Sequence, residues 1–388
     1  MTNSYDWLVI GGGITGAALG YELAKQGYSV LLLEKNTLPD NATCYSYGGL
    51  AYWSSMSPLT HQISHEGIEL HRRLSEELEA DTEFRDIDFL LTISTEENPQ
   101  QLAKTYTESG VKSRLIDAKE AGEREPLINR GAICGALLLS GGHIHPGKTA
   151  QAYLQAYQRL GGKLEFAQVL SLLKSGETIT GVKTPHQNYY AARTVICAGG
   201  FSRTLLQAAG INTPVYFTHA ELIKTPPIEN LQLRSLVMPA NLGRFQMEDS
   251  SCDLPNDDWL NTTNEEEKSG IMEPGAIQFA DGSFCIGQLS RIIANPYTPI
   301  DAAKSEATIR QGVGNVLPTL EKVPGTWHHC LVAFGSNSLP VVGEISPMTG
   351  LYLFSGFTST MLFAPPLAQH FARWVSGQED ELIEQIRI

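Results

Sequence analysis

The sequence predicts an α/β protein in which a parallel sheet is interrupted by a second, antiparallel sheet. Two short apolar runs, residues 7–10 and 29–33, flank a helical pattern and so are typical of neighbouring parallel strands. A third such run, residues 193–200, lies far along the chain. Between residues 213 and 326 the pattern changes to alternating segments with turn signals such as Asp281-Gly282, which are typical of antiparallel pairing.

The first unit, "YDWLVIGGGITGAALGYELAKQGYSVLLLEK" (residues 5–35), carries glycines at a specific spacing. Gly11 allows a tight turn, Gly13 lets the backbone approach a pyrophosphate, and Gly16 lets helix and strand pack closely. Because strand, glycines, helix and second strand are all in register, the unit predicts a dinucleotide-binding site and not an empty glycine-rich turn.

Both ends of the helix–strand unit support the same interpretation. Ile14 and Thr15 begin the helix, whose free N–H groups and dipole favour a phosphate. Glu34 ends the second strand, about 20 residues beyond the glycines, where its carboxylate can accept hydrogen bonds from a ribose diol. Lys35 follows directly and is also assigned to the site. These residues alone do not distinguish NAD from FAD.

Composition limits the remaining possibilities. The chain of 388 residues can hold about two domains, and 28 Lys and Arg against 42 Asp and Glu give a net charge of −14. This charge argues against nucleic acid and anionic membrane surfaces as partners, and no apolar run is long enough to span a bilayer. The N-terminus lacks the basic region of a signal peptide. The six cysteines contain no C-x-x-C pair, so we expect reduced thiols in a cytoplasmic protein without a metal site.

A second small-residue segment, "ATCYSYGGLAYW" (residues 42–53), follows the glycine unit. With this segment the whole chain resembles the D-amino acid oxidase/glycine oxidase/sarcosine oxidase family of FAD-dependent oxidoreductases. The resemblance implies FAD as cofactor, in a Rossmann-like domain of the glutathione reductase type with an inserted antiparallel-sheet substrate domain. In the family, a segment of this kind wraps FAD near its phosphates and isoalloxazine. The corresponding residues here are Thr43, Cys44, Ser46, Gly48 and Gly49.

The pattern along the chain divides it into two domains. Residues 1–60, 141–212 and 327–388 are expected to form a discontinuous FAD-binding domain. Residues 61–140 and 213–326 are expected to form the substrate-binding domain.

Two further glycine-ended strands complete the expected cofactor site. The segment "RTVICAGG" resembles the family's loop that closes over the dinucleotide, and it contributes Gly199. Near the C-terminus a strand ends and a helix begins, so backbone N–H groups there can face the electron-rich edge of a flavin. The residues assigned to this turn are Gly356, Thr358, Ser359, Thr360 and Met361.

The substrate side departs from the family in two places. Members that act on amino acids usually place an arginine shortly before "LPxxG", where its planar fork holds the substrate carboxylate, and here that position is Val332. Either Arg244 or Arg291 replaces it, or the substrate is not a simple amino acid. Sarcosine oxidase-like members also carry a lysine that helps oxygen react, and here Cys285 stands in its place. The electron acceptor is therefore left open between O2 and a quinone or carrier protein.

Two residues could take part in the chemistry. His219, in a segment where many members show Arg-Gly-Gln, is the candidate for contact with substrate or flavin, with a polar sheet pair as the equal alternative. Cys330 stands where sarcosine oxidase-like members bond covalently to the flavin 8α-methyl carbon, whereas glycine oxidase-like members bind FAD non-covalently. The bond requires a thiolate, which His328 or His329 could favour, and the alternative for Cys330 is packing as a buried thiol.

The sequence therefore predicts an FAD-dependent oxidoreductase that transfers a hydride from a C–H bond next to an amine nitrogen to flavin N5. The substrate would be an amino acid or an N-substituted amine, and orientation and desolvation would suffice without a dedicated base. Two alternatives remain open. One is a 2-hydroxy acid dehydrogenase in which His219 takes the hydroxyl proton. The other is a protein that binds FAD without catalysis.

Overall fold

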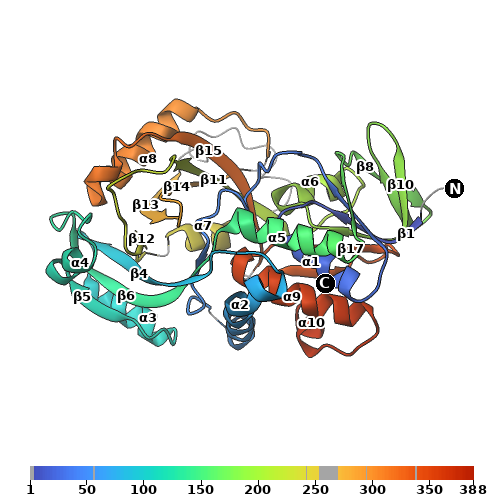
Figure 1. Cartoon of the computed structure of the whole chain (residues 1–388), viewed down its shortest axis with the longest axis horizontal. Coiled ribbons are helices and arrows are strands. Elements are labelled where there is room, and N and C mark those ends of the chain that lie inside the picture. Colours follow the sequence, from blue (N-terminus) through green and yellow to red (C-terminus); the bar gives the residue numbers. More distant parts are fainter. Residues whose placement is uncertain (1–3, 56, 242, 253–269, 294, 337–338) are drawn as a thin grey trace.

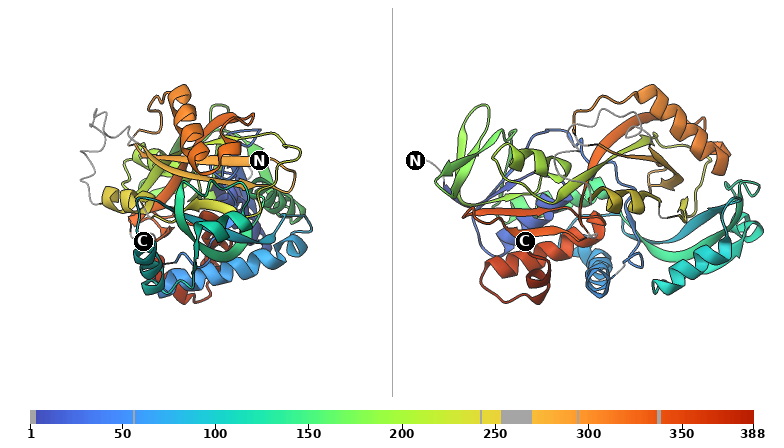
Figure 2. Two further views of the ribbon diagram at one scale, coloured as in Figure 1. Left: turned by 90° about the vertical axis from the view of Figure 1, so that its left-hand side faces the viewer. Right: turned by 180° about the vertical axis from the view of Figure 1, so that it is seen from behind.

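Two β-sheets, one toward each end of the molecule, organise the chain (Figure 1). In the view from behind, the C-terminal helices lie beside the sheet that contains the N-terminal strand (Figure 2). The computed structural model describes residues 4–55, 57–241, 243–252, 270–293, 295–336 and 339–388.

The first sheet is mainly parallel, as its apolar runs predict. Its strand order is β16-β17-β10-β1-β2-β7, and β8 and β9 extend it antiparallel from β10. Only β16 on the main path is antiparallel to its neighbour. The strands are β1 (Ser4–Ile10), β2 (Val30–Glu34), β7 (Lys163–Phe166), β8 (Ser171–Ser175), β9 (Thr178–Lys183), β10 (Asn188–Ile196), β16 (Val341–Glu344) and β17 (Leu351–Ser355).

Helices cover this sheet, and their apolar faces form its core. Leu19 and Leu23 on α1 are fully buried together with Trp7 and Phe371, which the helical spacing of apolar residues predicts. Burial of each such side chain stabilises the fold by about 1.5–3 kcal/mol. The helices here are α1 (Ile14–Lys25), α2 (Pro58–Glu77), α5 (Pro146–Arg159), α6 (Ser202–Gln207), α9 (Thr360–Val375) and α10 (Glu381–Ile386), with a short 3-10 turn η1 (Gly199–Phe201).

The second sheet is mainly antiparallel, with the order β15-β11-β14-β13-β12-β4-β6-β3 and β5 beside β6; β12 and β4 run parallel. The strands are β3 (Gly49–Leu50), β4 (Arg85–Ser94), β5 (Arg114–Asp117), β6 (Ile133–His143), β11 (Val215–Lys224), β12 (Leu236–Pro239), β13 (Ile271–Gln278), β14 (Phe284–Ile292) and β15 (Thr326–Gly335). Its helices are α3 (Pro99–Glu108), α4 (Ala118–Arg124), α7 (Gly243–Cys252), α8 (Ala302–Val316) and the 3-10 turn η3 (Pro318–Leu320). Over all the described residues, no helix has the length and apolarity to cross a membrane.

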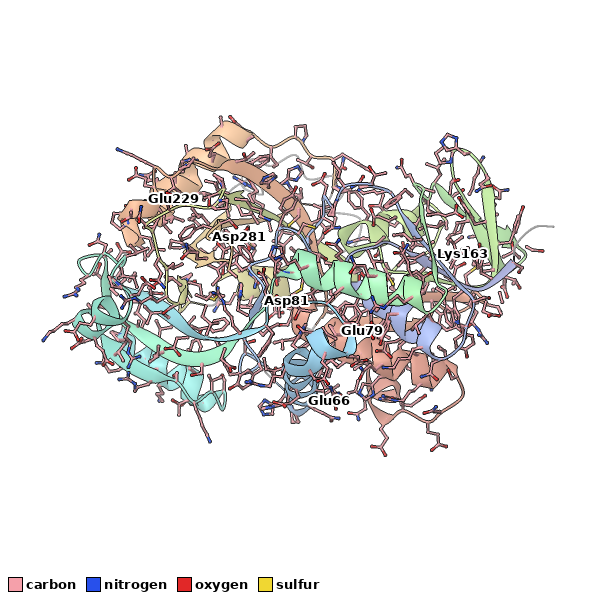
Figure 3. All side chains as sticks on the ribbon, in the orientation of Figure 1. Glu66, Glu79, Asp81, Lys163, Glu229 and Asp281 are labelled. Atoms are coloured by element: carbon pink, nitrogen blue, oxygen red, sulfur yellow. The ribbon has the colours of Figure 1, made fainter. Side chains whose placement is uncertain are left out.

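The β13–β14 hairpin turns where Asp281-Gly282 predicts it, and Figure 3 marks Asp281 on this sheet. Gly282 has a φ of 87°, which favours glycine, and Asp281 Oδ1 accepts a 2.9 Å hydrogen bond from the Ser283 N–H. Local turn chemistry therefore fixes this register.

Two elements make extensive contacts across the expected domain boundaries. α2 packs on α9, because its buried residues, Ile63 and Leu74 among them, belong to the same core as Trp7. β15 pairs along its full length with β11 and so belongs to the second sheet, although the boundary places residues 327–335 with the first. Both assignments depend on contacts between distant segments, which sequence pattern does not reveal.

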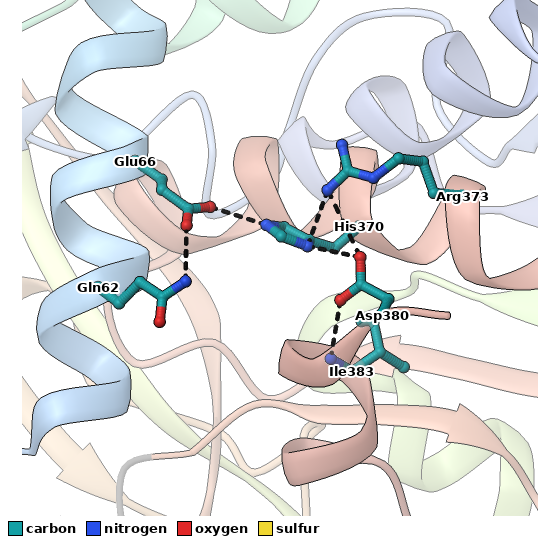
Figure 4. Close-up of polar contacts among 6 residues, drawn as sticks. All are labelled: Gln62, Glu66, His370, Arg373, Asp380 and Ile383. Carbon is teal, nitrogen blue, oxygen red and sulfur yellow. Dashed lines mark hydrogen bonds and ion pairs between the residues drawn. The ribbon is translucent and has the colours of Figure 1, made fainter. Parts of the chain in front are cut away.

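The side chain of His370 on α9 contacts residues of α2 and of the start of α10 (Figure 4). Its Nδ1 lies 2.7 Å from Asp380 Oδ2, and its Nε2 lies 2.7 Å from Glu66 Oε2 on α2. Asp380 caps α10 by accepting a hydrogen bond from Ile383 N–H, and it also pairs with Arg373. Burial alone would lower the pKa of His370, but the hydrogen bonds to Glu66 and Asp380 outweigh it and hold that pKa above its usual value.

The substitution His370→Gln is expected to lower stability more near pH 5.5 than near pH 8.5. Because the folded-state pKa of His370 is raised above 6.5, its ion pairs contribute fully below that pH and are lost as pH rises through the folded pKa. We expect a loss of about 1 kcal/mol at the lower pH. Denaturant unfolding of both proteins at the two pH values checks this, and an equal loss at both would contradict it.

Candidate cofactor site

A cavity of about 780 Å³ runs past the carboxyl ends of β1, β2, β7, β10 and β17 and reaches β15 of the second sheet. In sheets of parallel strands, ligands bind outside these carboxyl ends. The sequence-predicted residues that line the cavity are Gly11, Gly13, Ile14, Thr15, Glu34, Lys35, Thr43, Gly199, Cys330, Gly356 and Thr360. Those that the structure does not place on its wall are Gly16, Cys44, Ser46, Gly48, Gly49, His219, Thr358, Ser359 and Met361.

The glycine turn forms one wall, and at Gly11 and Gly16 the backbone leaves no room for a side chain. Gly11 has a φ of 110°, and a Cβ there would lie 2.5 Å from Cys197 O. A Cβ on Gly16 would lie 1.9 Å from Gly11 O, so helix α1 can approach β1 only with glycine at this position. A Cβ on Gly13 would meet Thr43 Oγ1 at 3.1 Å. Gly16 therefore acts behind the wall, by setting the distance between helix and strand.

Backbone hydrogen bonds fix the carboxylate of Glu34 beside the glycine turn. Its Oε2 accepts a 2.6 Å hydrogen bond from Gly12 N–H, and its Oε1 accepts a 3.0 Å bond from Asn36 N–H. Its carboxylate is half-buried at the carboxyl end of β2, beside the N-terminus of α1. This is the arrangement in which a carboxylate binds a ribose next to a diphosphate.

Two helices begin at the cavity. The Ile14 N–H at the start of α1 donates a 3.0 Å hydrogen bond to Thr43 Oγ1, whereas Ser359 at the start of α9 makes no capping hydrogen bond through its side chain. Thr358 Oγ1 is buried and has no hydrogen-bond partner among the described residues. Uncapped helix N-termini favour anionic or electron-rich groups, and a buried unpaired hydroxyl requires a partner. The residues present therefore fit a dinucleotide with an electron-rich ring.

The small-residue segment closes the cavity from the second sheet. The Tyr45 ring stacks on His328 with 4.7 Å between centroids, and its hydroxyl donates to Asp40 Oδ1 at 2.9 Å. Lys224 Nζ donates to the backbone oxygen of Cys44 at 3.1 Å. Tyr45, a residue of the segment predicted to wrap FAD, and His328, considered above only for its effect on the Cys330 thiol, both line the cavity. The stacking of these two rings depends on contact between distant segments, which the sequence did not indicate.

The glycines at the end of that segment have structural roles. Gly48 has a φ of 72°, and a Cβ there would lie 2.1 Å from Ile144 O. Gly49 forms β3 by pairing with His143, and Ser46 Oγ accepts a hydrogen bond from Gly48 N–H. These contacts hold the turn that brings Thr43 and Tyr45 to the cavity.

Cys330 projects from β15 on the same strand face as His328. His329 projects from the opposite face and stacks on His219 at 4.8 Å. All three residues of β15 line the cavity. Burial raises the pKa of the Cys330 thiol to about 12, and the charges of Asp40 and Cys44 act in the same direction. The thiolate is therefore strongly disfavoured in this environment.

His219 is buried on the sheet face opposite Cys330. Its Nδ1 lies 3.3 Å from Glu221 Oε1, and Glu221 is also paired with Arg291 and bonded by Trp327 Nε1. Burial, with a further contribution from Arg291, lowers the pKa of His219 to about 4. His219 is not among the described residues that line the cavity, but it stacks on His329, which does, and its catalytic role stays a prediction.

Val332 lines the cavity with its apolar side chain. Of the two arginines considered as replacements at this position, Arg291 is paired with Glu221, and Arg244 is paired with Glu248 and Glu273.

Comparisons with known proteins show similarity to FAD-dependent oxidoreductases. A family model described as DAO, FAD dependent oxidoreductase, matches residues 6–374. The chain is 25% identical over 377 residues to a 4-methylaminobutanoate oxidase (formaldehyde-forming) of Paenarthrobacter nicotinovorans, covering 95% of this chain and 43% of that protein. It is 29% identical over 245 residues to a glycine oxidase of Geobacillus kaustophilus, covering 60% of this chain and 64% of that protein.

The crystal structure of glycine oxidase from Geobacillus kaustophilus matches with a TM-score of 0.79 at 21% identity, covering 97% of this chain and 96% of that chain. The overall mixed α/β fold is thus similar to that of glycine oxidase. The chain spans 43% of the length of the 4-methylaminobutanoate oxidase and 64% of the length of the glycine oxidase.

Proposed function

The chain belongs to the family of FAD-dependent oxidoreductases, and on that premise we propose that it oxidises a C–H bond next to an amine nitrogen. The observation that carries the proposal is the cavity at the carboxyl ends of the parallel strands, lined by the glycine turn and Glu34. The named relatives include a 4-methylaminobutanoate oxidase and a glycine oxidase. The proposed substrate class is accordingly an amino acid or an N-substituted amine.

In this proposal the first sheet and its helices form a Rossmann-like FAD-binding domain, and the second sheet forms the substrate domain. Glu34 holds the ribose, and the turn from Gly11 to Gly16 with the N-terminus of α1 holds the diphosphate. The uncapped start of α9, whose Thr360 lines the cavity, would hold the electron-rich edge of the flavin. When bound, FAD supplies the hydride acceptor.

At the reacting end, this chain's residues position and enclose the substrate. Val332 and Phe357 line the cavity with apolar surface that excludes water, and Tyr45 stacked on His328 closes the side toward the second sheet. Holding the C–H bond in one orientation in a dry site lowers the entropic cost of the reaction. The proposal assigns no residue as a base.

An anaerobic substrate panel tests the proposal. Amines should bleach the visible absorbance of the FAD-loaded protein, and 2-hydroxy acids should not. Bleaching by hydroxy acids alone would favour the dehydrogenase alternative. A flavin that light reduces but no compound in the panel bleaches would favour a binding protein without catalysis.

The flavin is expected to be bound non-covalently. A covalent bond to Cys330 requires its thiolate, and burial raises the pKa of that thiol to about 12. Acid precipitation of the FAD-loaded protein should leave a yellow supernatant and a colourless pellet. Flavin fluorescence retained in the pellet, and abolished by Cys330→Ala, would show instead that the cofactor itself activates this thiol.

A further inference from the structure

One face of the second sheet continues from the cavity. Val332 lines the cavity and pairs in register with Thr218 of β11, which pairs on its other side with Ile292 of β14. Side chains at paired positions project to the same face. α7 covers this face, since Met247 packs against Ile292 and Phe334, and it lies near the middle of the molecule in Figure 1. Residues of α7 are therefore next to the position where the family's carboxylate-binding arginine would project.

Arg244, on α7, pairs with two carboxylates. Arg244 Nη1 lies 2.9 Å from Glu248 Oε1, and Arg244 Nε lies 3.3 Å from Glu273 Oε2 on β13. Thr218 Oγ1 donates a further 2.6 Å hydrogen bond to Glu248 Oε1. The side chains of Arg244, Glu248 and Glu273 are 17%, 5% and 10% exposed, so water screens these charges weakly. Two ionised carboxylates against one guanidinium give a net charge of −1 next to Thr218, the residue of β11 that pairs with Val332.

Tyr47 lies beside β13, the strand that carries Glu273. Its hydroxyl donates a 3.5 Å hydrogen bond to the backbone oxygen of Gly275, two residues along that strand from Glu273. Tyr45, two residues earlier, lines the cavity, and Trp53 packs in the same apolar cluster as both tyrosines. Aromatic faces and a surplus of carboxylate both attract an ammonium group.

Two other described cations of this sheet, Arg291 and Lys224, lie away from Val332. Arg291 projects from the opposite face and is paired with Glu221. Lys224 shares the face of Thr218 but lies six residues along β11, about 20 Å away at the usual strand rise, and donates to the backbone oxygen of Cys44.

We propose that the substrate is an amine, cationic in solution, that carries no carboxylate on the carbon next to its nitrogen, and that Glu248 and Glu273 determine this preference. The proposal rests on the proposed amine oxidation. The apolar Val332 offers a carboxylate no partner, and the cluster around Arg244 repels it while attracting the ammonium.

Non-reacting probes test the charge preference without turnover. Tetramethylammonium and acetate are titrated into the FAD-loaded protein, and perturbation of the flavin spectrum reports binding. We expect the ammonium ion to bind at least about tenfold more tightly than acetate. Acetate binding as tightly as the ammonium ion, or more tightly, would overturn the proposal.

Substitutions of the two glutamates test whether they cause the preference for a cation. Glu273→Gln and Glu248→Gln should each weaken ammonium binding and strengthen acetate binding, because each releases one edge of Arg244. Glu108→Gln, which alters an exposed ion pair on α3, should change neither. Glu273→Gln is measured first, because Glu248 also receives the Thr218 hydrogen bond. An unchanged ratio in both variants, with FAD content retained, would overturn the assignment.

Matched substrates extend the test to turnover. Sarcosinamide, which replaces the carboxylate of sarcosine with a neutral amide, should reduce the flavin anaerobically faster than sarcosine, and faster turnover of sarcosine would contradict the proposal. If the ammonium probe binds as expected but no amine reduces the flavin, the proposed oxidation fails while the charge preference stands. The two failures are therefore distinguishable.

Discussion

Gly16→Ala is expected to lower FAD affinity by at least about a hundredfold, which corresponds to about 2.8 kcal/mol. A Cβ at this position would lie 1.9 Å from Gly11 O, an oxygen atom of the backbone that cannot swing aside. To accept it, α1 must move away from β1, and the helix N-terminus then leaves the place where it meets the diphosphate. Titration of the apoprotein with FAD, followed by quenching of flavin fluorescence, measures the change.

Gly20→Ala is the matched control for this prediction. It makes the same substitution in the same helix, but a Cβ there meets Leu32 Cδ1 at 3.4 Å, an ordinary contact. Because alanine stabilises a helix interior relative to glycine, by about 1 kcal/mol, this variant should bind FAD normally and unfold no earlier. If both variants bind FAD as the unmodified protein does, the glycine turn is not the diphosphate site.

Glu34→Ala is expected to have the second largest effect, a loss of about 1.5–3 kcal/mol of FAD binding for each charge-assisted hydrogen bond removed. The same carboxylate also accepts hydrogen bonds from Gly12 N–H and Asn36 N–H, so the variant releases the glycine turn as well. Glu34→Gln retains the shape and an acceptor oxygen and should lose less. Unchanged affinity in Glu34→Ala would mean that the ribose lies elsewhere.

Much of the cofactor site could be predicted because its signals are local. The glycines at 11, 13 and 16 act within one turn, and Glu34 ends the strand that follows the same helix. Each of these positions depends on the residues next to it in sequence. The cavity wall contributed by residues 167–170, after β7, could not be predicted in this way, because it depends on the pairing of β7 with β2.

The substrate side was harder to predict because its geometry depends on distant pairing. The alternation of side chains separates His219 from Cys330, yet only the structure shows that β15 borders the cavity while His219 on its partner strand β11 does not line it. The same holds for Val332 and Arg244, whose relation depends on α7 packing across the sheet. The sequence showed that the arginine is absent at position 332. The pairing of Arg244 with Glu248 and Glu273 could be seen only in the structure.

Isotopic substitution tests the central claim, that this chain uses FAD to break a C–H bond next to an amine nitrogen. The FAD-loaded protein is mixed without oxygen with an N-methyl amine, and with the same amine deuterated at the methyl carbon. The account predicts that the visible flavin absorbance disappears with both, and more slowly with the deuterated compound, because transfer of that hydrogen limits the step. Equal bleaching rates would show that cleavage of that C–H bond does not limit flavin reduction. No bleaching by any amine would contradict the account.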